Sequence, residues 1–363
     1  MNESASAPER TMALGREKSA LPAGAPPGEV WTVLYRHGHR EREADSLADA
    51  AEAVQADRDL VAWVGMTDPD REQLLEAADR FALPRLAMED AIVAHQRPKV
   101  ETYGDVLFVV LRPARYDEDA ETVDVGEIHV FGSRDFVITI RHTRQIDFTV
   151  IRERLEAEPQ MLTHGPLAVL YGVLDQVVDA YAPAVAELQD DIDEVESEVF
   201  DGDRDASRRT YRLARQVIRL QRAVDPLAEV LDRLMAPLEH PERFRSHMPR
   251  PGQEHRAELR NYLRDVADHV AATREHVDGF RQLLENITEV HSALIGQSQN
   301  EAMKKVSSWG GILVVPTLIS SVFGMNIAPE PGYHWVFSWP LVLAFMALSS
   351  LLLYLLFRRN GWL

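Results

Sequence analysis

Nearly all of the long apolar sequence lies near the C-terminus, and this feature constrains the fold more than any other. The segments Val306–Pro329 and Pro331–Phe357 contain no Asp, Glu, Lys or Arg. A bilayer core about 30 Å thick needs roughly 20 helical residues at 1.5 Å each, and Val306–Met325 and Phe337–Phe357 both fit. Buried helices of a soluble core seldom run so long without a charge. The sequence therefore predicts two transmembrane helices.

The charges that flank these helices predict their orientation. Lys304 and Lys305 precede the first helix, and Arg358 and Arg359 follow the second. The connecting loop contains no Lys or Arg and one carboxylate, Glu330. Because positively charged flanks stay on the cytoplasmic side, both termini are expected in the cytoplasm of a multi-pass plasma (inner) membrane protein. An N-terminal apolar signal-peptide core is absent, which agrees.

Composition excludes several classes of protein. The 363 residues include no cysteine, which rules out disulfides and thiolate zinc sites. The formal net charge of −19 argues against a nucleic-acid partner, since phosphate contacts need a basic face. The same negative charge could either keep the protein soluble or attract cations to its surface.

The N-terminal third is predicted to form a mixed α+β cytoplasmic domain. Residues 1–28 are rich in Ala, Pro, Gly and Ser and are expected to be disordered. Residues 29–160 alternate β-type and helical patterns. The predicted strands are Val30–Tyr35, Val61–Met66, Val106–Leu111, Val123–Val130 and Phe136–Arg141. The predicted helices are Leu47–Ala56, Arg71–Phe81 and Leu86–Ala94, and Asp68-Pro69-Asp70 offers a capping Asp and a proline at the start of the second.

The rest of the chain is predicted to be helical. Residues 161–253 are expected to form a cytoplasmic helical hairpin. From Glu254 onward, apolar or neutral residues recur every three or four positions, which is typical of a long helix packed lengthwise on others. We expect one helix, roughly 100 Å long, in which a stalk continues into the first transmembrane helix. The predicted segments are 254–326 for this helix, 327–337 for the external loop, 338–357 for the second transmembrane helix and 358–363 for a basic cytoplasmic tail.

One face of the first transmembrane helix mixes small, hydroxyl and aliphatic side chains. At steps of three or four residues it reads Asn300, Met303, Val306, Gly310, Val314, Thr317, Ser321 and Gly324. Such a stripe either lines a water-filled pore or lets helices pack closely, and small residues favour the second interpretation at least as much. Pro316 within the helix would loosen its hydrogen bonding locally.

The stripe ends in Gly324-Met325-Asn326, directly before the loop that carries Glu330. With this motif at this place, the sequence resembles the CorA family of divalent-cation channels. The segments 86–90 and 95–101, the helix positions 300–304 and the C-terminal Trp362-Leu363 also resemble the family. The chain departs from the usual family pattern at Ser321, at Phe323 and in the Pro-Glu-Pro sequence around Glu330.

The resemblance implies a homopentameric funnel that conducts Mg²⁺, also Co²⁺ and possibly Ni²⁺, down the membrane potential. Mg²⁺ loses its waters reluctantly, and a ring of Asn326 carboxamides would bind those waters without adding charge. By resemblance, Gly324, Met325 and Asn326 form the selectivity filter, Glu330 lies in the external loop, and the pore is lined by Asn300, Met303, Val306, Gly310, Val314, Thr317 and Ser321. Regulatory Mg²⁺ between subunits would be held by Asp90 and Asp265, with Glu89 and Asp268 nearby. No organic cofactor is expected.

Two other interpretations remain open. A zinc or cobalt/nickel transporter of the same superfamily would share the architecture, and a membrane-anchored helical scaffold would explain the stalk without conduction. An enzyme is not expected, because the sequence contains no nucleophile elbow or metal-hydrolase motif. It also contains no nucleotide-binding loop of the Walker type, which favours a channel over a pump.

Overall fold

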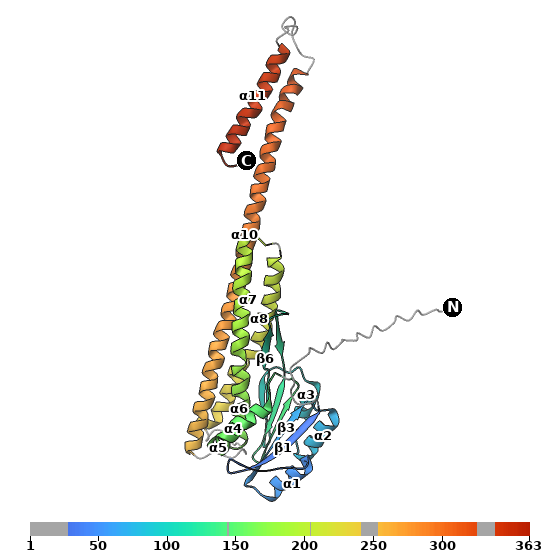
Figure 1. Cartoon of the computed structure of the whole chain (residues 1–363), viewed down its shortest axis with the longest axis vertical. Helices are drawn as coiled ribbons and strands as arrows, with labels where there is room; N and C mark the ends of the chain where they lie inside the picture. The colour runs from blue at the N-terminus through green and yellow to red at the C-terminus, as the bar shows by residue number, and fades with distance from the viewer. Residues whose placement is uncertain (1–27, 144, 204, 241–252, 325–337) are drawn as a thin grey trace, which may run out of the picture. The chain divides into compact units, whose positions relative to one another are not determined.

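The computed structural model describes residues 28–143, 145–203, 205–240, 253–324 and 338–363. The chain divides into two compact units (Figure 1). The first consists of Met1–Asp193 and Tyr211–Arg281, and the second of Glu194–Thr210 and Gln282–Leu363. The predicted disordered tail lies outside the described residues except for Gly28.

The first unit is built on a seven-stranded mixed sheet in the order β2-β1-β3-β9-β8-β5-β4. Its strands are β1 (Glu29–Arg36), β2 (His39–Glu43), β3 (Leu60–Thr67), β4 (Lys99–Tyr103), β5 (Val106–Leu111), β8 (Ile128–Gly132) and β9 (Phe136–Arg141). The β3–β9 pair is parallel, and the other neighbouring pairs are antiparallel. Strands β6 (Ala114–Asp117) and β7 (Thr122–Val125) form a separate hairpin.

Helices cover both faces of this sheet. One face carries α1 (Leu47–Ala56), α2 (Arg71–Arg80) and α3 (Arg85–Val93) (Figure 1). These helices share a core with alternate strand residues such as Val64 and Ile138. The other face carries α6 (Pro166–Asp179), which contacts β8 and β9 and packs on α4 (Phe148–Ala157) and the short α5 (Pro159–Leu162). Because both faces are buried, the central strands are apolar almost without interruption.

Asp70 starts helix α2 through a capping box. Its carboxylate accepts from the Gln73 N–H at 2.9 Å, and the Gln73 side chain accepts from the Asp70 N–H at 2.9 Å. We expect Asp70→Ala to destabilise the first unit by about 1 kcal/mol and to lower its melting temperature by about 2 °C. Hydrogen exchange of α2 in the full-length protein would check this. The control is Asp79→Ala, an exposed carboxylate in the last turn of the same helix, and an equal effect of both variants would contradict the cap assignment.

The remaining helices are long. They are α7 (Tyr181–Asp201), α8 (Ala206–Val224), α9 (Leu227–Glu239), α10 (Gln253–Phe323) and α11 (Ser338–Arg359). Helix α10 is a single helix of 71 residues. Most of its apolar repeat is buried, namely Leu259, Leu263, Val266, Val270, Val277, Phe280, Leu284 and Ile287. Leu294, the last position of this predicted repeat, is exposed.

Both C-terminal helices are long and apolar enough to cross a membrane, and their apolar stretches are almost wholly exposed. They are therefore not core helices of a soluble domain. The predicted fold class is confirmed for the mixed sheet with flanking helices, for the continuous long helix and for the two membrane helices. The pentamer stays a prediction.

One predicted strand is wrong. The segment Val123–Val130 is not a single strand, because β7 and β8 are separated at Gly126 and belong to different sheets. The Gly126 N–H donates to the Pro113 carbonyl at 2.9 Å, and a Cβ at Gly126 would lie only 2.4 Å from the Cβ of Thr143. This close approach requires glycine and ends the first strand.

Candidate functional site

One face of the membrane-spanning part of α10 is turned toward α11. A Cβ added to Gly311 would lie 3.6 Å from the ring of Phe357 on α11. One residue further, Ile312 is only 7 % exposed, and Ser308 is buried on the turn before. Gly311 is therefore the small residue that faces the neighbouring helix.

The predicted pore-lining residues lie on another face and are all exposed in the single chain. They are Asn300, Met303, Val306, Gly310, Val314, Thr317 and Ser321. Among the described residues, a Cβ added to Gly310 would meet no heavy atom within 4 Å beyond the backbone of its own helix, in contrast to Gly311. Gly310 thus does not serve packing against α11. The face is available for water or for further copies of the chain.

This part of α10 contains a proline within the continuous helix. Pro316 lies beside an open groove that is also lined by Thr317, Ser320, Ser321 and, from α11, Met346. The Thr317 hydroxyl donates to the Leu313 carbonyl at 2.8 Å. A hydroxyl bonded to the backbone in this way is common where a proline removes a neighbouring hydrogen bond.

Helix α10 ends where the Gly-Met-Asn motif begins. The last helical residue is Phe323, and the Gly324 N–H still donates to the Ser320 carbonyl at 2.9 Å. A Cβ at Gly324 would approach this carbonyl oxygen to 3.1 Å, which is a tight contact. Glycine is therefore well suited to the end of the helix. Met325, Asn326 and Glu330 lie outside the described residues.

Asp90, one of the predicted regulatory carboxylates, forms an ion pair within the first unit. The Lys99 ammonium lies 2.7 Å from the Asp90 carboxylate and 2.9 Å from that of Glu101. Partial burial lowers the pKa of Lys99, but its hydrogen bonds to Asp90 and Glu101 outweigh this effect and raise the pKa overall. Glu89, which precedes Asp90 in α3, is exposed. A metal at Asp90 would therefore compete with the ammonium of Lys99.

Asp265 and Asp268 lie exposed on α10. Asp179, at the end of α6, lies close enough to Asp265 for the charge of Asp265 to change its pKa. Burial raises the pKa of Asp179, and the nearby charges of Asp175 and Asp265 raise it further, against opposing effects of His269 and Arg154. Asp179 could not be identified from sequence, because only the packing of α6 beside α10 brings it near Asp265.

The predicted regulatory residues do not form one cluster in the single chain. No hydrogen bond or ion pair joins Asp90 to Asp265 in the described ranges. Across those ranges, no group of three or more His, Asp or Glu side chains is arranged to hold a metal ion.

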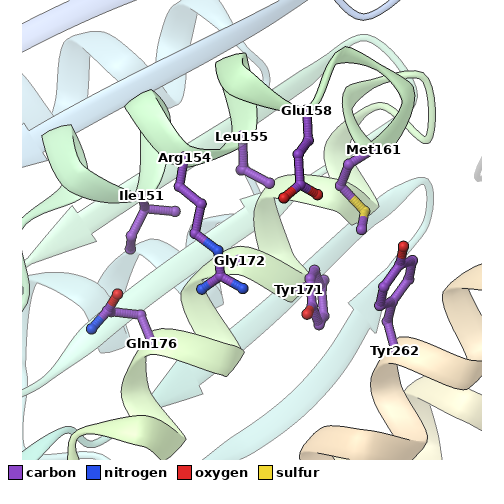
Figure 2. Close-up of a pocket in the computed structure, with 9 residues that line it drawn as sticks. All are labelled: Ile151, Arg154, Leu155, Glu158, Met161, Tyr171, Gly172, Gln176 and Tyr262. Atoms are coloured by element: carbon purple, nitrogen blue, oxygen red, sulfur yellow. The ribbon is translucent and has the colours of Figure 1, made fainter.

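A polar cavity of about 180 Å³ is lined by Tyr262, which precedes Asp265 by three residues on α10. Arg154 and Glu158 reach into it from the end of α4, and Tyr262 of α10 points toward Tyr171 of α6 (Figure 2). The centroids of these two phenol rings are 5.1 Å apart. Burial, followed by the charge of Asp175, raises the pKa of Tyr171 to about 12, so its hydroxyl stays a hydrogen-bond donor.

The sequence matches a known family over most of its length. The family described as CorA-like Mg²⁺ transporter protein matches residues 59–359. The cobalt/magnesium transport protein CorA of Thermotoga maritima is 26% identical over 354 residues, which cover 94% of this chain and 97% of that protein.

Solved structures show the same fold. The complete structure of the CorA magnesium transporter from Methanocaldococcus jannaschii aligns with a TM-score of 0.69 at 19% identity, covering 92% of this chain and 98% of that one. The full-length CmaX protein aligns with a TM-score of 0.66 at 17% identity, covering 93% and 99% of the two chains. At these identities the likeness establishes the architecture and not the activity.

Proposed function

Because the chain belongs to the CorA family of Mg²⁺ transporters, we propose that it conducts Mg²⁺, together with Co²⁺ and Ni²⁺, into the cytoplasm through a pore shared by several copies. The observation that carries the proposal is the exposed face of α10. It presents small and hydroxyl residues, includes Gly310, which does not pack on α11, and leads in the sequence to Gly324-Met325-Asn326.

The proposed filter suits a hydrated dication. Mg²⁺ keeps its octahedral water shell, so a selective mouth must bind those waters rather than strip them. The carboxamide oxygen of Asn326 accepts hydrogen bonds from water and adds no charge that would trap the ion. Because Gly324 has no side chain, the end of the helix is narrow. Several copies can therefore approach the common axis of the proposed pore.

We propose a homopentamer with both termini in the cytoplasm. Two transmembrane helices per chain cannot enclose a water-filled path, so several copies are needed. The Lys304-Lys305 and Arg358-Arg359 pairs favour a cytoplasmic position of the flanks. Inward movement of a dication then gains about 4.6 kcal/mol per 100 mV, at roughly 2.3 kcal/mol per charge. Native mass spectrometry of the detergent-solubilised protein tests the proposed number of copies.

We further propose that cytoplasmic Mg²⁺ closes the pore by bridging Asp90 of one copy to Asp265 of the next, with Glu89 and Asp268 nearby. Both aspartates are accessible from outside the protomer, Asp265 fully and Asp90 in part. Replacing both by Ala is expected to leave the pore open at Mg²⁺ concentrations that close the unmodified protein. Unchanged closure would refute the bridge.

The ion pair at Asp90 gives a prediction of opposite sign. Lys99→Met removes a positive charge that competes with the metal, so closure should need less Mg²⁺. A unit charge about 6 Å from a dication in water-like surroundings contributes about 1.4 kcal/mol, which corresponds to a roughly tenfold shift in the closing concentration. The measurement is Mg²⁺ flux as a function of cytoplasmic Mg²⁺. The control is Arg85→Met, which removes a charge at the start of the same helix, and equal shifts in both variants would argue against competition at Asp90.

Ion competition tests the identity of the transported metal. Purified protein in liposomes should admit Mg²⁺, with Co²⁺ and Ni²⁺ competing for entry. A strong preference for Zn²⁺ that depends on a proton gradient would instead favour the zinc branch of the superfamily. Absence of flux for all four metals, in protein of the correct assembled mass, would favour a non-conducting scaffold.

A further inference from the structure

An open cavity of about 350 Å³ lies within the first unit, where several turns of the chain meet. Basic residues line it from three of these turns, namely His37 after β1, Arg58 before β3 and Arg134 between β8 and β9. The turn between α5 and α6 adds His164, and the first turn of α10 adds His255. The volume is within the range of small-molecule sites. The cavity therefore gathers two guanidinium groups and three imidazoles from separate parts of the chain.

The lining of this cavity is positively charged in an otherwise acidic protein. Arg58 and Arg134 contribute +2, and Asp59, the one carboxylate of the lining, contributes −1, which gives +1 with neutral imidazoles. The whole chain has a formal net charge of −19. Within the described residues, neither guanidinium forms an ion pair or a hydrogen bond. Both are therefore free to bind an anion that enters the cavity.

His164 has a ring nitrogen without a partner. Its side chain has no exposed surface, and its Nε2 lies 3.4 Å from the Glu258 Oε2, which is long for a hydrogen bond. Nδ1 makes no hydrogen bond to any part of the chain that the structure describes. Buried polar groups are nearly always satisfied by protein, water or a ligand. A hydrogen-bond acceptor in the cavity would satisfy Nδ1.

The turn that carries His37 is held firmly at the wall of the cavity. Both of its central residues have positive φ, 49° at His37 and 81° at Gly38. A Cβ at Gly38 would lie only 2.2 Å from the Pro159 carbonyl oxygen, so the turn packs closely against α5. Two-residue hairpin turns of this kind favour Asn before Gly. The backbone alone would therefore favour Asn at position 37, whereas His adds an imidazole to the lining.

We propose that this cavity binds a small phosphate-bearing anion, held by the guanidinium groups of Arg58 and Arg134 and by the imidazoles of His37 and His164. Guanidinium groups form paired, charge-assisted hydrogen bonds with phosphate oxygens. A phosphate offers several acceptor oxygens, so it can accept from both arginines and from the imidazoles at once.

The protonation of His164 is compatible with such a ligand. Burial lowers the pKa of this imidazole; Glu258 opposes this effect, and His255 adds to it. An anion near Nδ1 would act in the same direction as Glu258 and would favour the protonated ring, which donates from both nitrogens. Because His255 belongs to α10, a bound anion would also tie the start of this helix to the turns of the sheet.

The site is separate from the proposed pore and does not rest on ion conduction. It also shares no residue with the proposed regulatory bridge at Asp90 and Asp265. The Asn326→Ala variant should therefore bind phosphate like the unmodified protein. Failure of this inference would leave the proposed channel untouched, and the reverse also holds.

Isothermal titration calorimetry of the purified full-length protein with inorganic phosphate, in a metal-free buffer of constant ionic strength, tests the proposal. The expected result is saturable binding of one phosphate per chain. Arg58→Met and Arg134→Met should each weaken binding by more than about tenfold, because each removes hydrogen bonds between charged groups. His37→Asn should weaken it by about threefold and keep the turn, since Asn-Gly is a favoured sequence there.

Arg80→Met is the matched control, because Arg80 is an exposed arginine of α2 that does not line the cavity. Phosphate should raise the melting temperature of this control but not that of Arg134→Met. A nucleoside monophosphate is the second probe: tighter binding than that of phosphate would assign the site to phosphomonoesters, and equal or weaker binding would assign it to free phosphate. Absence of saturable binding for both probes, or equal affinity in Arg134→Met and the control, would overturn the proposal.

Discussion

Asn326→Ala is expected to abolish Mg²⁺ conduction while leaving the assembled protein intact. Each carboxamide that binds a water of the hydrated ion contributes about 1 kcal/mol. In the proposed pentamer, five copies would lose about 5 kcal/mol together, which corresponds to a decrease in flux of more than about a thousandfold. Asn326 comes three positions after the last residue of α10, and we expect its replacement to leave folding unaffected.

The measurement is Mg²⁺ entry into liposomes that contain equal amounts of each protein. Asn286→Ala is the matched control, because Asn286 is an exposed amide on α10, outside the proposed pore face. We expect full flux from the control and background flux from Asn326→Ala, with the same assembled mass for both. Conduction that survives in Asn326→Ala would exclude this side chain as the filter and favour another path.

The second large effect is block of the pore from within. The chain has no cysteine, so a single engineered thiol reacts without background. In Val314→Cys, a water-soluble cationic methanethiosulfonate reagent should place one positive charge per copy beside the ion path. At about 6 Å in water, each charge repels a dication by about 1.4 kcal/mol, and five charges raise the barrier by about 7 kcal/mol.

Mg²⁺ flux should therefore stop after modification of Val314→Cys and return when dithiothreitol removes the adduct. Leu313→Cys is the control, because the preceding residue is turned by 100° around the helix axis and is also exposed in the single chain. It should react slowly and keep its flux. Block of Leu313→Cys with no effect at Val314→Cys would assign the pore to another face of α10.

The elements with strong local signals could be predicted from sequence. Helix α1 has the predicted bounds, α2 begins at the predicted Arg71, and α10 is the single long helix that its apolar repeat indicated. In each case, local propensity and the pattern of burial favour the same structure. The two membrane helices were equally clear, because an apolar stretch of twenty residues without a charge is rare outside membrane-spanning helices.

Strands without an apolar pattern could not be predicted. All five residues of β2 are exposed, and four of them are Arg or Glu. It is an edge strand whose charges discourage pairing with other chains. Strands β7 and β8 looked continuous because the break depends on Thr143, which is distant in sequence and packs against Gly126. Tertiary contacts of this kind leave no local signal.

The same limit applies to the candidate sites. The stripe of α10 and the Gly-Met-Asn motif could be identified from spacing and position. The competition between Lys99 and a metal at Asp90 could not, because it depends on strand β4 lying beside α3. The position of Asp179 near Asp265 and the meeting of His164 with α10 also follow from packing alone.

The most direct test of conduction is the initial rate of Mg²⁺ entry into liposomes at a series of imposed membrane potentials, without nucleotide and without a pH gradient. A conductive pore should admit Mg²⁺ at a rate that rises as the interior becomes more negative. Entry that needs a proton gradient, or no entry at any potential, would contradict the proposal that this chain forms a Mg²⁺ channel.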